Sequence, residues 1–165
     1  VTPSVPFDVY VVAFDLEGDV LAYEFGLDGV PLGLFKVGQA LYGPGPLNVG
    51  NEDTFDFIVG TGGCASGAGA VPLVNLTFLA TGPVANDTAI VVRGSNPSSF
   101  DGLPGWATCD DRIETFGVAT TGGGADPNDP ETAYPDGALI LNPTEGFEAP
   151  VSGDEESFGS VKARF

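Results

Sequence analysis

One group of possible ligand-binding side chains lies in an acidic segment, residues 122–137. Four carboxylates fall within eleven residues there, and they are Asp126, Asp129, Glu131 and Asp136. Ca²⁺ takes about six to eight oxygen ligands, so these carboxylates are candidates for a calcium site. Their spacing matches no EF-hand loop, and three prolines interrupt the segment. A solvated loop without bound metal is therefore the competing and favoured interpretation.

The two cysteines, Cys64 and Cys109, are the next candidates for chemistry. Two thiols without histidine make a poor metal site. A reactive thiol needs a nearby cation, but Arg112 is the only base close in sequence, and Asp110 and Asp111 oppose it. A structural disulfide is favoured over two buried free thiols or a reactive thiol. Such a bond would close a loop of about 45 residues, worth roughly 4 kcal/mol at most.

The residue types that are missing exclude much catalysis. The chain has no histidine, which rules out Ser-His-Asp and Cys-His nucleophile systems and histidine-ligated zinc. Glycosidases need only two carboxylates at a suitable separation, and among 23 acidic residues some pair will always satisfy that distance. Such a pair is therefore no sign of activity, and we expect no enzyme and no cofactor other than the calcium considered above.

Charge excludes two classes of partner. Five basic residues stand against 23 acidic ones, giving a formal charge of −18. Phosphate backbones and anionic membrane surfaces would repel such a chain, so we expect no nucleic-acid partner. No apolar run is long enough to span a membrane, and we expect any export signal to have been removed already. The same acidity is also compatible with a halophilic source.

Two further features suggest carbohydrate. Asn75 and Asn86 each begin an N-x-[ST] sequon, so both are candidate glycosylation sites. The second feature is a set of aromatic residues that could form a platform for stacking sugars: Tyr10, Tyr23, Trp106 and Tyr134. The alternative is that Trp106 fills one edge of the core beside the disulfide.

The elements that must position these residues are short strands. Gly (25) and Pro (14) leave little room for helices among 165 residues. Alternation of apolar and polar residues predicts about nine strands, at 6–16, 20–28, 32–38, 55–60, 71–81, 89–93, 114–120, 138–141 and 157–165. We expect the first two to form a hairpin, and 61–70 and 94–112 to be loops.

Together the strands predict one all-β domain over 1–165, an antiparallel sandwich or jelly roll without significant helix. The inward-facing residues should include Val9, Val11, Phe25, Leu76, Phe78, Val161 and Phe165.

Several segments carry a resemblance. The opening FDVYVVAFDL, the strand VPLVNLTFLAT and the ending SFGSVKARF together resemble cohesin-like sandwiches of secreted bacterial proteins. With PSSFDGLPGWATCDDRIETFGVA between them, the likeness is closer to uncharacterised exported bacterial domains. The resemblance implies an extracellular or cell-surface location and carries no activity. Such domains usually have a further strand before the first one, whereas only VTPSVP precedes it here.

These observations favour a secreted, non-catalytic structural domain that associates with identical subunits. The terminal strand would pair with a neighbouring subunit, through the residues Phe158, Val161, Ala163 and Phe165. The competing interpretation is that this strand pairs beside 6–16 in its own sheet. Other hypotheses are a module that binds a polysaccharide or a surface protein, and a calcium-dependent adhesin.

Overall fold

The structure is a computed structural model that describes residues 1–14, 16–118, 138–142 and 160–164. Within them lie twelve strands and one short 3₁₀ helix, Glu52–Thr54, and no α-helix. The strands are β1 (Pro6–Phe14), β2 (Val20–Asp28), β3 (Leu34–Leu41), β4 (Leu47–Asn48), β5 (Asp56–Ala65), β6 (Val71–Ala80), β7 (Thr88–Arg93), β8 (Gly105–Thr108), β9 (Ile113–Thr115), β10 (Gly117–Val118), β11 (Ala138–Leu141) and β12 (Ser160–Arg164).

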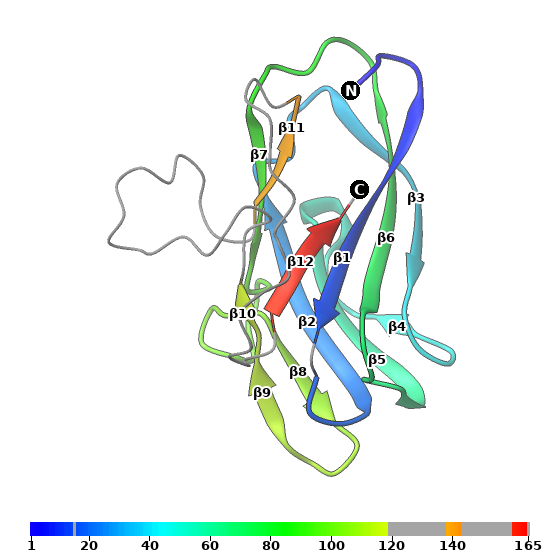
Figure 1. Cartoon of the computed structure of the whole chain (residues 1–165), viewed down its shortest axis with the longest axis vertical. Coiled ribbons are helices and arrows are strands. Elements are labelled where there is room, and N and C mark those ends of the chain that lie inside the picture. Colours follow the sequence, from blue (N-terminus) through cyan, green and yellow to red (C-terminus); the bar gives the residue numbers. More distant parts are fainter. Residues whose placement is uncertain (15, 119–137, 143–159, 165) are drawn as a thin grey trace.

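The strands form two sheets that face each other, as Figure 1 shows. One has the order β10-β12-β1-β6-β3, and the other has the order β11-β7-β2-β5-β4, with β8 paired to β2 and β9 paired to β8. Neighbouring strands are antiparallel except β10 and β12, which are parallel. The predicted all-β antiparallel sandwich is therefore confirmed.

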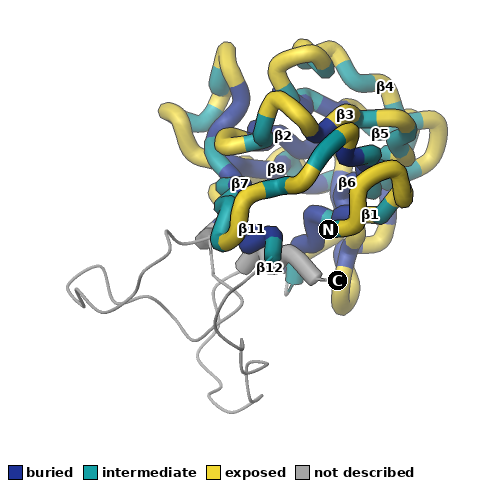
Figure 2. The backbone as a smooth tube through the Cα atoms, turned by 90° about the horizontal axis from the view of Figure 1, so that it is seen from above, coloured by how far each residue is buried: buried dark blue, intermediate teal, exposed yellow. Residues whose placement is uncertain are grey.

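Alternation along the strands builds the core between the sheets. Along most of β1 and β6 buried residues alternate with less buried ones, and the alternation is interrupted where the pairing shifts between Val11 and Val12. The predicted inward residues Val9, Val11, Leu76 and Phe78 are all buried. In the opposite sheet Phe25 stacks on a second buried phenylalanine at a ring distance of 5.0 Å. In Figure 2 the buried segments, in dark blue, lie toward the interior of the molecule, and the exposed segments, in yellow, lie on its outside.

The predicted hairpin between the first two strands is wrong. β1 belongs to the five-stranded sheet and β2 to the seven-stranded sheet, so the turn between them crosses from one layer to the other. Contacts with the far loops hold this turn: Arg112 donates to the Glu17 carbonyl at 2.5 Å, and the Cys109 N–H donates to the Asp19 carbonyl at 3.0 Å. The residues Gly18 and Asp19 favour a turn, but the same residues suit a hairpin within one sheet and a turn that crosses between sheets. The local sequence therefore could not distinguish the two arrangements.

Two predicted loops contain strand. β5 continues through 61–65, so Cys64 lies in a strand rather than in a loop, and β8 lies inside 94–112. The segment 114–120 corresponds to β9 and β10, as far as the structure describes it. Glycine-rich and proline-rich sequence has low β propensity, but here the sheet neighbours supply the ladder. β2 and β4 pair with β5, for example Ala22 and Leu47 with Gly60. Further along β5, Gly62 donates to the carbonyl of Pro44, in the bend before β4, at 2.6 Å, and a Cβ on Gly62 would lie 2.9 Å from that oxygen.

The terminal segment pairs beside β1, which is the arrangement weighed against strand donation. The register places Arg164 opposite Tyr10 and Lys162 opposite Val12. Val161 and Ala163 lie opposite Ala13 and Val11. Phe158 and Phe165 lie outside the described residues, so their predicted roles, like donation to a neighbour, stay predictions.

Candidate functional site

The predicted calcium ligands Asp126, Asp129, Glu131 and Asp136 lie outside the described residues. Within the described ranges, no three His, Cys, Asp or Glu side chains gather as a metal site would require. The calcium site therefore stays a prediction.

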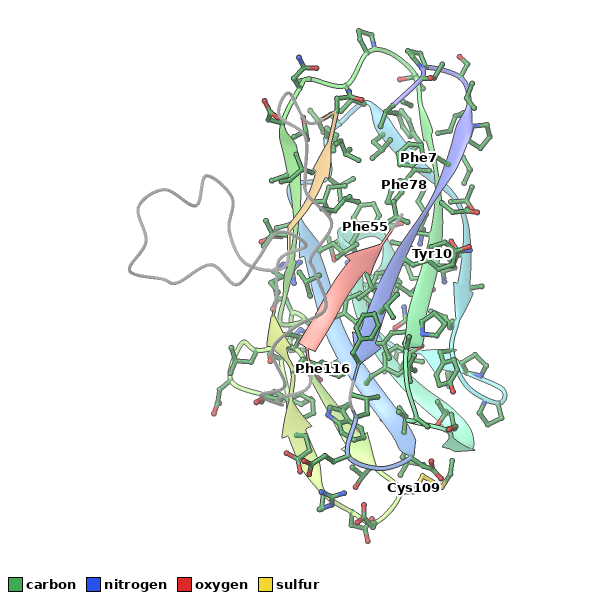
Figure 3. All side chains as sticks on the ribbon, in the orientation of Figure 1. Phe7, Tyr10, Phe55, Phe78, Cys109 and Phe116 are labelled. Carbon is green, nitrogen blue, oxygen red and sulfur yellow. A yellow bond between two sulfur atoms is a disulfide. The ribbon has the colours of Figure 1, made fainter. Side chains whose placement is uncertain are left out.

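Cys64 and Cys109 form a disulfide, with their Cα atoms 5.9 Å apart. The bond joins the end of β5 to the turn after β8, at the lower end of the molecule in Figure 3. The predicted disulfide is confirmed, and no free cysteine remains. Thiol chemistry is thereby excluded while the bond is intact.

The predicted sugar platform is not assembled. Trp106 is buried in the core and stacks on Phe116 at a ring distance of 6.4 Å, which confirms that it is a core residue. Tyr23 is also buried, and its hydroxyl donates to the Leu73 carbonyl at 2.7 Å. Burial raises the pKa of this phenol well above its usual range. Tyr10 lies on β1 in the other sheet, and Tyr134 lies outside the described residues.

The two sequons differ in accessibility. Asn86 is exposed in the loop before β7. Asn75 lies in mid-sheet between Tyr10 and Ala40, and its Oδ1 is buried with no hydrogen-bond partner among the described residues. Asn86 is therefore the better candidate for modification, and glycosylation itself stays a prediction.

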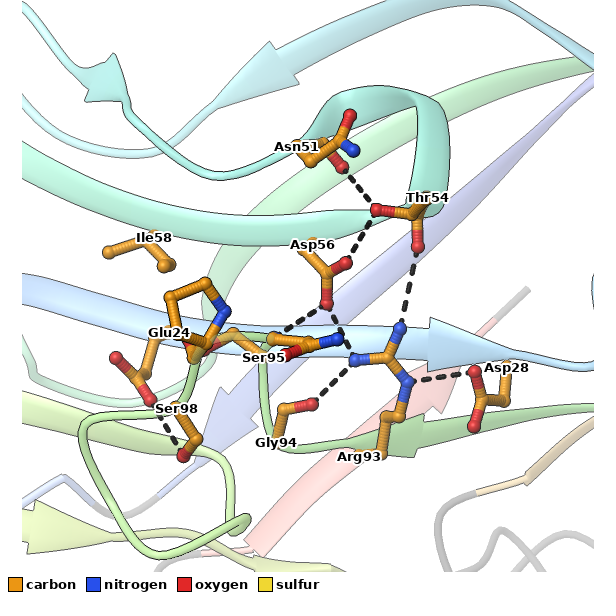
Figure 4. A network of polar contacts seen from close by, with 12 residues as sticks. Glu24, Asp28, Asn51, Thr54, Asp56, Ile58, Arg93, Gly94, Ser95 and Ser98 are labelled. Atoms are coloured by element: carbon orange, nitrogen blue, oxygen red, sulfur yellow. Dashed lines mark hydrogen bonds and ion pairs between the residues drawn. The ribbon is translucent and has the colours of Figure 1, made fainter.

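The most developed polar arrangement surrounds Arg93, at the end of β7 (Figure 4). Its Nη1 lies 2.6 Å from Oδ1 of Asp56 on β5, and its Nε lies 2.7 Å from Oδ1 of Asp28 on β2. Gly26, also on β2, makes room for the guanidinium, because a Cβ there would lie 2.0 Å from Nη1. The site thus joins three strands on the outer face of the seven-stranded sheet.

Asp56 is only 2% exposed, and both of its oxygens are bonded to the protein. Oδ1 also accepts the Asn96 N–H at 2.8 Å, and Oδ2 accepts the Thr54 hydroxyl at 2.6 Å. Burial raises the pKa of this carboxyl, but the bonds from Arg93, Thr54 and Asn96 outweigh burial and leave the pKa lowered. Asp56 therefore stays ionised at neutral pH.

Glu24 is a second buried carboxylate, also 2% exposed. One of its oxygens accepts the Ser99 N–H at 2.8 Å and the Ser98 hydroxyl at 3.2 Å. Glu24 and Asp56 therefore both bind the segment 94–103 and hold it on the outside of the sheet. Since these carboxylates bind the chain's own backbone, the arrangement is suited to fixing a loop rather than to acid–base catalysis.

A second polar cluster lies where the edge strands β3 and β4 come together. Glu52 accepts from Gln39 Nε2 at 2.6 Å and from Lys36 Nζ at 3.2 Å, and the bond from Gln39, followed by that from Lys36, lowers the pKa of Glu52. The pairing of β3 with β6 is irregular between Lys36 and Gly38. A bulge and an inward lysine are devices that protect edge strands from pairing with other chains.

Sequence reasoning did not find the Arg93 site. Its members come from three strands and one loop, and no local motif joins them. The one available signal was Gly26, a glycine inside a predicted strand, which often marks a close approach by another group.

Comparison with family models, with curated proteins and with solved structures gives no match to this chain. The described residues contain no helix long and apolar enough to cross a membrane. The resemblance to exported cohesin-like domains accordingly stays a prediction.

Proposed function

We propose that this chain is a secreted, non-catalytic structural domain that assembles with copies of itself by exchanging strand β12. Within one chain, the pairing of β12 beside β1 is the competing arrangement, but it also defines the position that a donated strand would occupy, and that position carries the proposal. The two strands pair over five residues, Tyr10–Phe14 against Ser160–Arg164. A second copy's β12 has the same sequence, so it fits this position with the same backbone hydrogen bonds.

The length of the connection allows the exchange. Residues 143–159 separate β12 from β11, and a chain of that length reaches at most roughly 60 Å when extended. That distance exceeds the width of a small domain, so a neighbouring subunit is within reach.

Two further features support a durable extracellular role. The Cys64–Cys109 disulfide forms and persists in oxidising compartments outside the cytosol. The buried carboxylates of Asp56 and Glu24 accept hydrogen bonds from the backbone of the protein's own segment 94–103. This use of the two carboxylates favours a structural role over a catalytic one.

The test uses the register between the two strands. One batch of protein carries Val12→Cys and another carries Lys162→Cys, and the two are mixed and oxidised mildly. The register places these positions opposite each other, so exchange between copies gives a covalent dimer on non-reducing gels. The matched control replaces the first variant with Phe35→Cys, on the far edge strand, and should give no dimer.

The same positions distinguish the competing arrangement. A single chain carrying both Val12→Cys and Lys162→Cys closes its bond internally when β12 stays in its own sheet. Internal closure together with no dimer in the mixture overturns strand exchange.

A further inference from the structure

Strand β12 is bordered on both sides within its sheet. β1 pairs with it antiparallel over five residues, and β10 pairs with it parallel at two, Gly117 opposite Ser160 and Val118 opposite Val161. Among the described strands, β10 rather than β12 is therefore the edge of the five-stranded sheet (Figure 1). A strand bonded on both sides is exchanged only after the hydrogen bonds on both sides have opened.

β10 is too short to keep this place through its own hydrogen bonds. It has two residues, and among the described strands it pairs with β12 alone. Fixing the backbone of each residue costs conformational entropy, which a few backbone hydrogen bonds offset only in part. A contact outside the ladder must therefore hold β10 beside β12.

Phe116, the residue directly before β10, makes such a contact. It is 3% exposed, and its ring stacks on Trp106 of β8 with the ring centres 6.4 Å apart. Its N–H donates to the Pro104 carbonyl at 2.9 Å. Phe116 is also the one residue between β9 and β10, so the chain passes there from the seven-stranded sheet to the five-stranded sheet. Burial of this ring therefore fixes the place where β10 begins.

The hairpin of β8 and β9, which carries both rings, is itself firmly held. β8 pairs with β2, and β9 pairs with β8. Beyond β8, in the turn of the hairpin, Cys109 is bonded to Cys64 of β5. Trp106 is 4% exposed and belongs to the core. Because the hairpin is fixed, the contact between Phe116 and Trp106 decides whether β10 is held or released.

We infer that β10, anchored by Phe116, is a latch that controls how often β12 leaves its place beside β1. The inference rests on the proposed function, since it names the regulation of the position at which strands are exchanged. While Phe116 is buried, β12 is an interior strand and rarely opens. When Phe116 leaves Trp106, β10 loses its anchor and β12 becomes an edge strand held on one side. β12 then opens more often, without unfolding of the rest of the sheet.

Hydrogen–deuterium exchange of the full chain tests the latch without requiring contact between copies. The readout is the exchange rate of the β12 amides, and the internal standard is β6 in the same sheet. Phe116→Ala should accelerate exchange in β12 about tenfold or more relative to β6, because only β12 depends on the latch. Phe116→Leu keeps an apolar side chain and should give a smaller change in the same direction, so it replaces the alanine variant if that variant does not fold.

The matched control is Phe57→Ala, on β5 of the other sheet. Phe57 is also buried and also stacks on an aromatic ring, that of Phe25, at 5.0 Å. Its loss lowers the stability of the whole domain and leaves the latch in place, so the rate of β12 relative to β6 should not rise. Melting curves verify that each variant is folded. Equal acceleration of β12 and β6 in the Phe116 variants overturns the latch, and so does an unchanged rate in β12.

The mixture of Val12→Cys and Lys162→Cys chains separates the latch from the proposed function. With Phe116→Ala added to both batches, the covalent dimer should form faster than without it. Dimers that form at the same rate in both mixtures overturn the latch and support strand exchange. No dimer in either mixture, together with selective acceleration of β12, overturns strand exchange and supports the latch as a property of the single chain.

Discussion

Arg93 and Asp56 lie 37 residues apart in the chain, and their side chains meet at 2.6 Å on the outer face of the seven-stranded sheet. The contact ties the end of β7 to the start of β5, and the Asn96 N–H adds the following loop to the same carboxylate. One buried ion pair therefore fixes two strands and the segment that covers Glu24.

Replacing Asp56 with asparagine should destabilise the fold strongly. The substitution removes the charge and leaves Arg93, which is 27% exposed, with the solvent-exposed Asp28 as its one charged partner among the described residues. Breaking a buried pair in this way costs about 3–5 kcal/mol in proteins, and we expect a value near the lower end. Urea unfolding measures the change. Asp28→Asn is the matched control and should cost less than about 1 kcal/mol, because that pair is exposed; equal losses would contradict the assignment.

The same carboxylate predicts how stability depends on pH. The pKa of Asp56 is lowered in the folded state, so the unfolded chain binds a proton more readily. Its stabilising contribution is complete above the unfolded value of about 3.9 and is lost as pH falls through the lower, folded pKa. Unfolding free energy should fall on acidification below about pH 4, and less steeply in Asp56→Asn. An identical slope in that variant would show that other carboxyls account for the loss.

The core was predictable from sequence, whereas the Arg93 site was not. The alternation of apolar and polar residues in β1 and β6 marks Val11 and Phe78 as buried. Successive side chains of a strand point to opposite faces of its sheet, so the apolar set faces the other sheet. The choice of sheet for each strand depends on long-range contacts, so the turn after β1 was misassigned as a hairpin. Arg93 and Asp56 meet only after β2, β5 and β7 have been placed side by side, and no spacing in the sequence encodes that placement.

Phe78 should be one of the most sensitive core positions. Its ring packs against Phe7 at 6.1 Å and Phe55 at 5.9 Å between the two sheets (Figure 3). Phe78→Ala leaves a cavity and should cost about 3–5 kcal/mol. Phe35→Ala, at a half-exposed ring on the outer face, should cost less than about 1 kcal/mol. Denaturant unfolding of both variants measures the difference, and similar values would mean that the Phe78 cavity collapses.

The disulfide should contribute a few kcal/mol. Cys64 and Cys109 are 45 residues apart, and the chain-entropy model gives roughly 4 kcal/mol for closing such a loop. A variant with both cysteines changed to alanine should therefore melt several degrees lower and should remain folded at room temperature. Reduction of the wild-type protein should lower its melting temperature by a similar amount. A reduced protein that melts at the oxidised temperature would show that the bond only joins positions already held by the sheet.

The terminal strand gives the last prediction, since β12 covers one side of β1 along Tyr10–Phe14. Deleting residues 157–165 exposes the backbone groups of β1, so the truncated chain should be less stable than the full chain and prone to association. A synthetic peptide of the sequence SFGSVKARF, added in excess, should bind the truncated chain and raise its melting temperature, because it restores the missing ladder. A peptide of the same composition in scrambled order is the control. Capture of the native peptide alone shows that β12 can be supplied by another molecule, as strand exchange requires. A truncated chain that melts like the full chain and ignores both peptides would show that the position beside β1 has no affinity for this strand, and the proposed mode of assembly would then be wrong.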